Sequence, residues 1–253
     1  MRIARFSMGG EVGFGVLESD ELVVIDTHPF GELTYTGARL PLAGVRLLAP
    51  IIPSKVVAIG KNYADHAKEM GGEAPTTPLI FIKPSTSIIG PRDAIQRPAS
   101  VTQLDYEGEL AVVIGRLARD VPADRALDVV LGYTCANDAT AREQQRADVQ
   151  FTRAKSYDTF CPLGPWIETA LDPSDVGVTT HLNGEVRQDG RTSELVHSVR
   201  DVIAFVSGVM TLLPGDVILT GTPAGVGPMV AGDEVAVTIE GIGTLSNTVV
   251  DRG

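Results

Sequence analysis

The chain has 253 residues, 43% of them hydrophobic, and a mean hydropathy of +0.12, which predicts a globular protein with a sizeable core. Its 32 acidic and 21 basic residues give a net charge of −11, which argues against nucleic acid or an anionic membrane as a main partner. The longest mainly apolar stretch, 202–213, is too short to span a bilayer, so we expect a soluble cytoplasmic protein. Cys135 and Cys161 lack CxxC spacing and are predicted to be buried free thiols.

The first 50 residues alternate short apolar runs with Gly and Pro, which predicts a small β-rich N-terminal domain over residues 1–53. A larger domain would occupy residues 54–253. Apolar runs in this second part predict strands at 55–59, 79–83, 109–114, 131–136, 165–168, 178–182, 217–220 and 234–239.

Helices are predicted at fewer places. Asn62 is positioned to cap a short helix that ends at Met70, and the apolar residues of 199–213 recur at helical spacing before Pro214. Strands do not alternate regularly with long helices, and no nucleotide-binding fingerprint is found, so a Rossmann or barrel fold is disfavoured. The predicted class is α+β, mainly β.

Two glutamates, Glu107 and Glu109, stand at the start of an apolar, β-branched run. Residues i and i+2 of a strand share a face, so the two carboxylates would leave the backbone together, about 7 Å apart. Two like charges at this spacing need a cation or a shared proton, although an exposed strand end with solvated acids is the alternative. Gly108, between them, would let another backbone or a ligand approach closely.

A third carboxylate, Asp138, follows a predicted strand at the point where the composition changes to that of a helix. As an isolated residue it would cap that helix, and Arg142 and Gln145, at i+4 and i+7, would share its helix face. Together with Glu107 and Glu109 it offers three oxygen ligands, a set that favours Mg²⁺, Mn²⁺ or Ca²⁺ over zinc.

Three further segments carry polar groups suited to catalysis or binding. His66 and Glu69, at i and i+3, form the base and orienter of a water-activating pair, or else a surface pair. Lys155 lies in a turn-rich loop and would stabilise an enolate or carboxylate near a metal, or else be a solvated charge. Gly221 and Thr222 begin a Gly-rich loop that could hold a substrate carboxylate through backbone amides and the hydroxyl, or be a plain turn.

Five motifs in this order resemble the fumarylacetoacetate hydrolase family: GKNYADHAKE from Gly60, DYEGELAVVIG from Asp105, NDATAREQQ from Asn137, AKSYDTFCPLGP from Ala154 and GTPAGVG from Gly221. The resemblance covers about 55–227, and residues 1–50 look like the short N-terminal domain of compact bacterial members. It implies a mixed β-roll catalytic domain, a homodimer, and a Mg²⁺ or Mn²⁺ ion, with Ca²⁺ as another option.

The same resemblance implies a role for each matching residue. The metal would be held by Glu107, Glu109 and Asp138. The catalytic residues would be His66, Glu69 and Lys155, and the substrate would contact Arg142, Gln145, Gly221 and Thr222.

The expected substrate is a small 2-oxo mono- or dicarboxylate that reacts through an enolate. C–C bond hydrolysis or decarboxylation, of an acylpyruvate or an oxaloacetate-like acid, is the first expectation. Isomerisation of 2-hydroxyhepta-2,4-diene-1,7-dioate in aromatic compound catabolism is the alternative, and a non-catalytic metal-binding protein is a more remote one. A glycosidase is disfavoured, because two carboxylates on one strand flank a sugar bond poorly.

Overall fold

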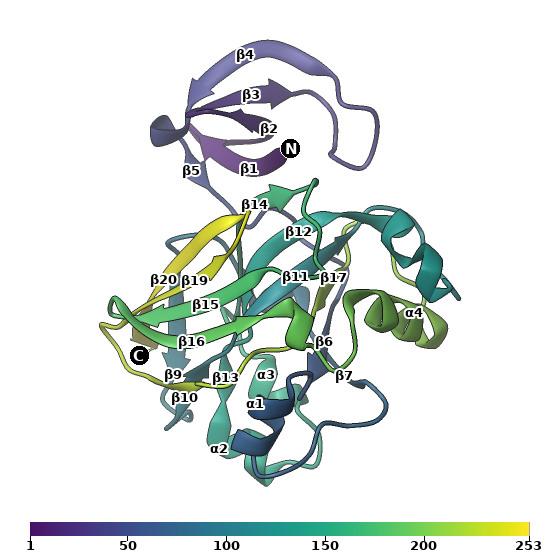
Figure 1. Ribbon diagram of the computed structural model, residues 1–253. Helices are drawn as coiled ribbons and strands as arrows, with labels where there is room; N and C mark the ends of the chain where they lie inside the picture. The colour runs from purple at the N-terminus through teal and green to yellow at the C-terminus, as the bar shows by residue number, and fades with distance from the viewer. Residues whose placement is uncertain (253) are drawn as a thin grey trace.

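The computed structural model describes residues 1–252, which fold into a mainly β structure, as predicted (Figure 1). The N-terminal part is built of short strands and one 3₁₀ turn. In chain order these are β1 (Arg2–Met8), β2 (Glu11–Glu18), β3 (Glu21–Ile25), β4 (Tyr35–Pro41), η1 (Leu42–Gly44) and β5 (Arg46–Leu47).

The remainder of the chain adds strands, four short α-helices within the described residues, and 3₁₀ turns. In chain order these are β6 (Val56–Gly60), α1 (Ala64–Glu69), β7 (Leu79–Lys83), η2 (Ser85–Ser87), β8 (Ile88–Ile89), β9 (Ala94–Pro98), β10 (Leu104–Tyr106), β11 (Gly108–Ile114), η3 (Ala123–Val129), β12 (Val130–Asn137), β13 (Thr140–Ala141), α2 (Arg142–Ala147), α3 (Thr152–Lys155), β14 (Cys161–Glu168), β15 (Gly177–Leu182), β16 (Glu185–Arg191), η4 (Thr192–Glu194), α4 (Val199–Val209), β17 (Val217–Leu219), β18 (Gly227–Met229), β19 (Glu234–Ile239) and β20 (Gly243–Arg252).

The strands form one large mixed sheet and two smaller sheets. The large sheet has the order β4-β3-β2-β1-β14-β12-β11-β17-β6-β7, a second sheet has the order β16-β15-β19-β20-β9, and β13, β10 and β18 form the third. Strand β1 pairs antiparallel with β14, so hydrogen bonding continues from the N-terminal strands into the rest of the large sheet. Figure 1 shows the N-terminal strands at one end of the molecule and helices α1, α2 and α3 gathered at the opposite end.

Strand β11 lies at the centre of the packing, because both of its faces are buried. Leu110 and Val112 pack into a core shared with β15, β19 and α4. Ala111 and Val113, which point the other way, pack into a second core with β14 and β17. A strand buried on both faces requires a continuous apolar run rather than an alternating one, which is what this segment of the sequence contains.

Gly108, at the start of β11, lies where the large sheet is packed closely against the second sheet. A Cβ atom at this position would lie 2.1 Å from Thr180 Oγ1 and 3.2 Å from Val237 Cγ1, atoms of β15 and β19. Side chains of the second sheet thus approach Gly108 closely, in place of the backbone or ligand that the sequence predicted.

Two helix predictions are wrong in detail. Helix α4 ends at Val209 rather than near 213, because Met210 is extended and Leu212 instead exchanges backbone hydrogen bonds with Ala118. Asn62 does not cap α1, which has Tyr63 at its N-cap. The Asn62 side chain donates to the carbonyls of Thr220 and His197 and accepts from the His197 amide, so it ties together three separate segments.

Both cysteines are buried free thiols, as predicted. Burial raises the pKa of Cys135 and of Cys161 to about 12, which keeps both thiols protonated and unreactive at neutral pH. Among residues 1–252, none of the helices has the length and apolar character needed to cross a membrane.

The packing at Gly108 predicts that Gly108→Ala destabilises the protein. The added methyl group overpacks the contact between the two sheets, at an expected cost of about 1–3 kcal/mol in the free energy of unfolding. Gly208→Ala is the matched control: Gly208 lies within α4 with open space around it, so this change should stabilise by up to about 1 kcal/mol. Urea denaturation checks both, and equal stabilities would contradict the packing argument.

Candidate active site

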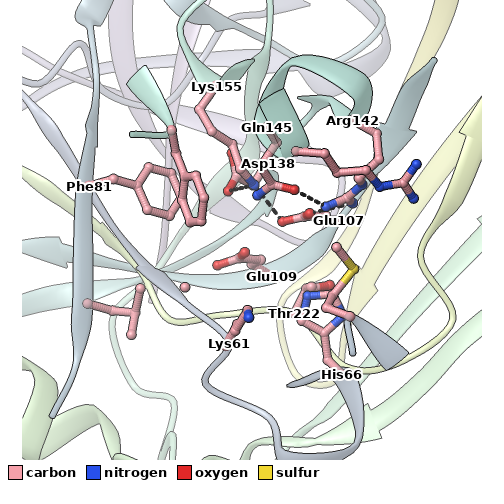
Figure 2. A pocket seen from close by; sticks show the side chains of 15 residues that line it. Lys61, His66, Phe81, Glu107, Glu109, Asp138, Arg142, Gln145, Lys155 and Thr222 are labelled. Atoms are coloured by element: carbon pink, nitrogen blue, oxygen red, sulfur yellow. Dashed lines mark hydrogen bonds and ion pairs between the residues drawn. The ribbon is translucent and has the colours of Figure 1, made fainter. Parts of the chain in front are cut away.

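A cavity of about 180 Å³ lies at the end of the molecule where α1, α2 and α3 gather (Figures 1 and 2). Its lining includes His66 from α1, Arg142 from α2, Lys155 from α3 and the three carboxylates Glu107, Glu109 and Asp138. A pocket of this size is below the range typical of drug-sized ligands, so the cavity suits a small molecule.

The pairing of β11 with β12 brings the three carboxylates together. Gly108 is paired with Asn137 in this antiparallel register. Glu107 and Glu109 flank Gly108, and Asp138 directly follows Asn137, so the register brings all three acids to the same place. One carboxylate oxygen from each of the three acids lies within 4.8 Å of the others. The three side chains are 4%, 2% and 1% exposed, so all are withdrawn from bulk water.

The backbone around two of these acids differs from the prediction. Glu107 does not lie in a continuous strand with Glu109, because the ladder breaks there: its amide donates to Asn137 Oδ1 and its carbonyl accepts from the Asp138 amide. Asp138 does not cap a helix, since α2 begins at Arg142 after the short strand β13. The expectation that Asp138 shares a helix face with Arg142 is therefore wrong.

Three buried cations form ion pairs with Glu107 and Asp138, two of these three acids. Lys155 Nζ donates to Glu107 Oε2 at 2.7 Å and to Asp138 Oδ2 at 2.6 Å. Lys83 Nζ donates to the other oxygen of Asp138 at 2.6 Å. Arg142 donates to Glu107 Oε1 and to Asp105 Oδ2, both at 2.7 Å. The acids and cations thus form one connected chain of ion pairs.

This arrangement shifts the pKa values of the charged groups in opposite directions. Burial raises the pKa of Glu107, but the charges of Lys155 and Arg142 outweigh burial and hold it well below its ordinary value. Burial, together with the charges of Asp138 and Glu107, raises the pKa of Glu109 well above its ordinary value. Burial lowers the pKa of Lys155, but the negative charges of Asp138 and Glu107 raise it by more than burial lowers it. The net shift of the pKa is upward, so the ammonium stays charged.

The residues of the site fit a divalent cation. Glu109 is buried beside Glu107 and Asp138 and receives a hydrogen bond from the Gly221 amide at 2.6 Å, but it has no direct cation partner among residues 1–252. When all groups are ionised, the acids Asp105, Glu107, Glu109 and Asp138 exceed the cations Lys83, Arg142 and Lys155 by one negative charge. A hard cation bound by oxygen ligands would compensate this excess negative charge beside Glu109.

His66 and Glu69 form the predicted pair on α1. His66 Nδ1 lies 3.1 Å from Glu69 Oε2, and the other oxygen of Glu69 accepts from the Gly225 amide at 3.1 Å. His66 is buried and lines the cavity (Figure 2). Because Nδ1 faces Glu69, Nε2 is the ring nitrogen left for chemistry in the cavity.

The predicted substrate-contacting residues are held by the protein in different ways. Arg142 donates to Gln145 Oε1 at 2.5 Å, so the amide nitrogen of Gln145 is free to donate elsewhere. Thr222 lines the cavity, but its hydroxyl donates to the Gly108 carbonyl and accepts from Gln188. The Gly221 amide donates to Glu109, so in this structure it orients a carboxylate of the protein.

Sequence reasoning missed two members of the ion-pair chain, Lys83 and Asp105. Lys83 ends an apolar strand, Leu-Ile-Phe-Ile-Lys, and is fully buried. A lysine is seldom buried without a partner of opposite charge. Its position in an apolar strand was therefore the signal that could have predicted a buried ion pair. Asp105 begins the motif that supplies Glu107, and it orients Arg142 from the other side.

The chain belongs to the fumarylacetoacetate hydrolase family. The family described as "Fumarylacetoacetate (FAA) hydrolase C-terminal" matches residues 55–250, and "Rv2993c-like, N-terminal" matches residues 1–50. The resemblance predicted from five motifs is thus confirmed. Proteins of this family with which the chain compares are hydrolases, isomerases and tautomerases, and the chain is accordingly an enzyme.

Similar proteins span this range of names. Protein Rv2993c of Mycobacterium tuberculosis is 56% identical, over 99% of this chain and 95% of that protein. Oxaloacetate tautomerase YisK of Bacillus subtilis is 45% identical, over 82% of this chain and 74% of that protein.

Two solved structures also cover the whole of this chain. 2-Hydroxyhepta-2,4-diene-1,7-dioate isomerase from Mycobacterium marinum is 51% identical, with 99% of its chain covered and a TM-score of 0.94. Maleylpyruvate hydrolase from Sphingobium sp. SYK-6, solved with manganese(II) and pyruvate, is 34% identical, with 100% of its chain covered and a TM-score of 0.83.

The buried position of Lys83 predicts that Lys83→Met strongly destabilises the protein. The change leaves Asp138 without one of its two cations, and breaking a buried ion pair in this way costs about 3–5 kcal/mol. Lys68→Met is the control, because Lys68 forms an exposed pair with Asp65 and should cost at most about 1 kcal/mol. Chemical denaturation measures both, and a loss at Lys83 no larger than at Lys68 would refute the structural role.

Proposed function

We propose that this enzyme acts on a small 2-oxo acid, or on its enol, with a divalent cation bound by Glu107, Glu109 and Asp138. The observation that carries the proposal is the position of these three buried carboxylates in one small cavity with Lys155 and His66. Mg²⁺ or Mn²⁺ fits the all-oxygen donor set, and Ca²⁺ is a further option. A bound divalent cation would polarise the 2-oxo group and stabilise negative charge as it develops on the oxygen.

Lys155 is the residue proposed to stabilise the enolate. Its ammonium stays charged in the cavity, and the ring of Phe81 lies 5.1 Å from its nitrogen, which favours a cation at this place. Two of its three donors bind Glu107 and Asp138, which leaves one for the substrate. Gln145 would orient the substrate with its free amide, and Arg142 supports it by holding the amide oxygen.

His66, held by Glu69, is proposed as the general base. In C–C bond hydrolysis, Nε2 would take a proton from the water that attacks the distal carbonyl of an acylpyruvate. The bond between carbons 3 and 4 then breaks, the acyl group leaves as a carboxylic acid, and the pyruvate enolate takes up a proton at carbon 3. The base arrangement supports hydrolysis of this kind as the first candidate. Decarboxylation of an oxaloacetate-like acid, which belongs to the same candidate, would instead release carbon dioxide and leave an enolate beside Lys155 that then takes up a proton.

Proton transfer without bond cleavage is the second candidate. The names of the tautomerase from Bacillus subtilis and the isomerase from Mycobacterium marinum favour it, since both relatives are more similar to this chain than the maleylpyruvate hydrolase is. In this reaction His66 would move a proton to or from carbon 3 of the substrate. Four expectations from the sequence stay predictions: a homodimer, a cytoplasmic location, a domain boundary at residue 53 and a role in aromatic compound catabolism.

A substrate panel with metal removal tests the proposal. Acetylpyruvate, fumarylpyruvate, oxaloacetate and the heptadienedioate are offered with Mg²⁺ or Mn²⁺, before and after thorough chelation. We expect at least one to be consumed, and the activity to disappear on chelation and return with metal. Full activity of the chelated protein would exclude the metal-dependent mechanism.

Direct metal binding supplies a second measurement. Glu109→Gln removes a predicted ligand, and Mn²⁺ affinity by calorimetry should fall by more than the about 10–100-fold typical for loss of a supporting contact. Glu185→Gln is the control, because Glu185 is exposed, pairs with Arg187 and does not line the cavity. Unchanged Mn²⁺ affinity in Glu109→Gln would remove this residue from the ligand set.

The role of His66 is tested by His66→Ala. Loss of the general base should lower kcat by about 10²–10⁴-fold, while Mn²⁺ and oxalate still bind by calorimetry. His181→Ala, on β15, is the matched control and should keep its activity. If acylpyruvate hydrolysis is lost but keto–enol exchange persists, His66 activates water; unchanged turnover would exclude His66 from both reactions.

A further inference from the structure

We propose that Lys61 and Arg146 form a second anion subsite in the cavity, which binds the far carboxylate of a dicarboxylic substrate. This inference rests on the proposed function, because it assumes that the other end of the substrate lies at the Glu107, Glu109 and Asp138 site. It narrows the substrate class to small 2-oxo dicarboxylates.

The pairing of the other cations points to these two residues. Of the basic residues that line the cavity, Arg142 is bound to Asp105 and Glu107, and Lys155 to Glu107 and Asp138. Within residues 1–252, neither Lys61 nor Arg146 forms an ion pair with a carboxylate of the protein. Their charges are therefore available to a ligand.

Lys61 is held in an unusual backbone conformation at the cavity wall. Its φ angle is +56°, in the left-handed region that residues with a Cβ atom seldom adopt, and it directly follows β6. Such conformations persist where the surrounding structure enforces them, and they gather at ligand sites. The side chain is half-buried and lines the cavity (Figure 2), and its Nζ lies 3.5 Å from where a Cβ atom of Gly72 would be, beyond the end of α1.

Arg146 lines the cavity from α2, whereas Lys61 lines it from the end of β6. Arg146 lies four residues after Arg142 and therefore on the same helix face. Arg142 is fully buried and Arg146 is exposed, yet both line the cavity, so this face of α2 extends from the floor of the cavity to its mouth. A guanidinium at the mouth can bind a carboxylate with two parallel hydrogen bonds.

The part of the cavity between the three carboxylates and the proposed subsite of Lys61 and Arg146 suits a short carbon chain. Phe81 and Phe151 line it and pack edge to face, with ring centroids 5.6 Å apart. A carboxylate that entered this partly apolar space without a cation partner would lose hydration uncompensated. The two cations remove this penalty for a dicarboxylate, whereas a monocarboxylate would leave them without a ligand.

Binding of two hydroxy acids tests the subsite independently of turnover. Malate and lactate share the chelating hydroxy-acid end and differ in the far carboxylate, and calorimetry measures their Kd with the Mn²⁺-loaded protein. We expect malate to bind about 10–100-fold more tightly, the range for a charged hydrogen bond. Arg146→Gln and Lys61→Gln should each reduce this preference by tenfold or more.

Two comparisons complete the experiment. Oxalate, which mimics the chelating end alone, should bind both variants as it binds the unmutated protein. Arg153→Gln removes a nearby exposed charge outside the cavity lining and should keep the malate preference. A malate preference that Arg146→Gln and Lys61→Gln leave intact, or an equal effect of these two changes on malate and lactate, would overturn the subsite. Absence of turnover with every 2-oxo acid would overturn the proposed function instead, and the malate preference would still decide the subsite.

Discussion

The active site depends on a connected chain of buried ion pairs, in which each charged side chain stabilises its neighbours. Asp105, Arg142, Glu107, Lys155, Asp138 and Lys83 alternate in charge along this chain. A buried charge is tolerated only with a partner, so removal of one member leaves its neighbours uncompensated. Lys83 and Asp105 lie on strands, Arg142 and Lys155 on the short helices α2 and α3, and Glu107 and Asp138 in the breaks that follow β10 and β12. Helices of four to six residues are not stable alone, and these ion pairs, with the packing around them, fix both helices.

Apolar runs predicted strands well whether buried, as in β11, or partly exposed, as in β7, whereas the buried β14 was predicted only over 165–168 of its range Cys161–Glu168. Strands β6, β11 and β12 are nearly continuous apolar runs because they lie inside the large sheet, and their predicted ranges agree with the structure within one residue. Strands β16 and β20 were not predicted, since much of each is exposed and their polar residues hide the pattern. The end of α4 was misplaced because Leu212 and Ala118 form a long-range pair that local spacing does not reveal.

For the site, the sequence indicated which side chains meet but not how they are held. Glu107, Glu109 and Asp138 were predicted from strand periodicity, a composition change and family motifs, and the structure gathers them. One of the two cation partners of Asp138 is Lys83, 55 residues earlier in the chain, and no local pattern links two residues at that separation. The same limit hid the contact between Gly221 and Glu109.

The contrast between the two ends of α2 bears on how this enzyme can be altered. At its buried end, Arg142 shares donors with three other residues, and a substitution there would disturb all of them. At its exposed end, Arg146 shares no ion pair with the described part of the chain. Evolution or an engineer can therefore exchange side chains at the cavity mouth with little penalty to folding, and a single scaffold can acquire new selectivities while its chemistry is preserved.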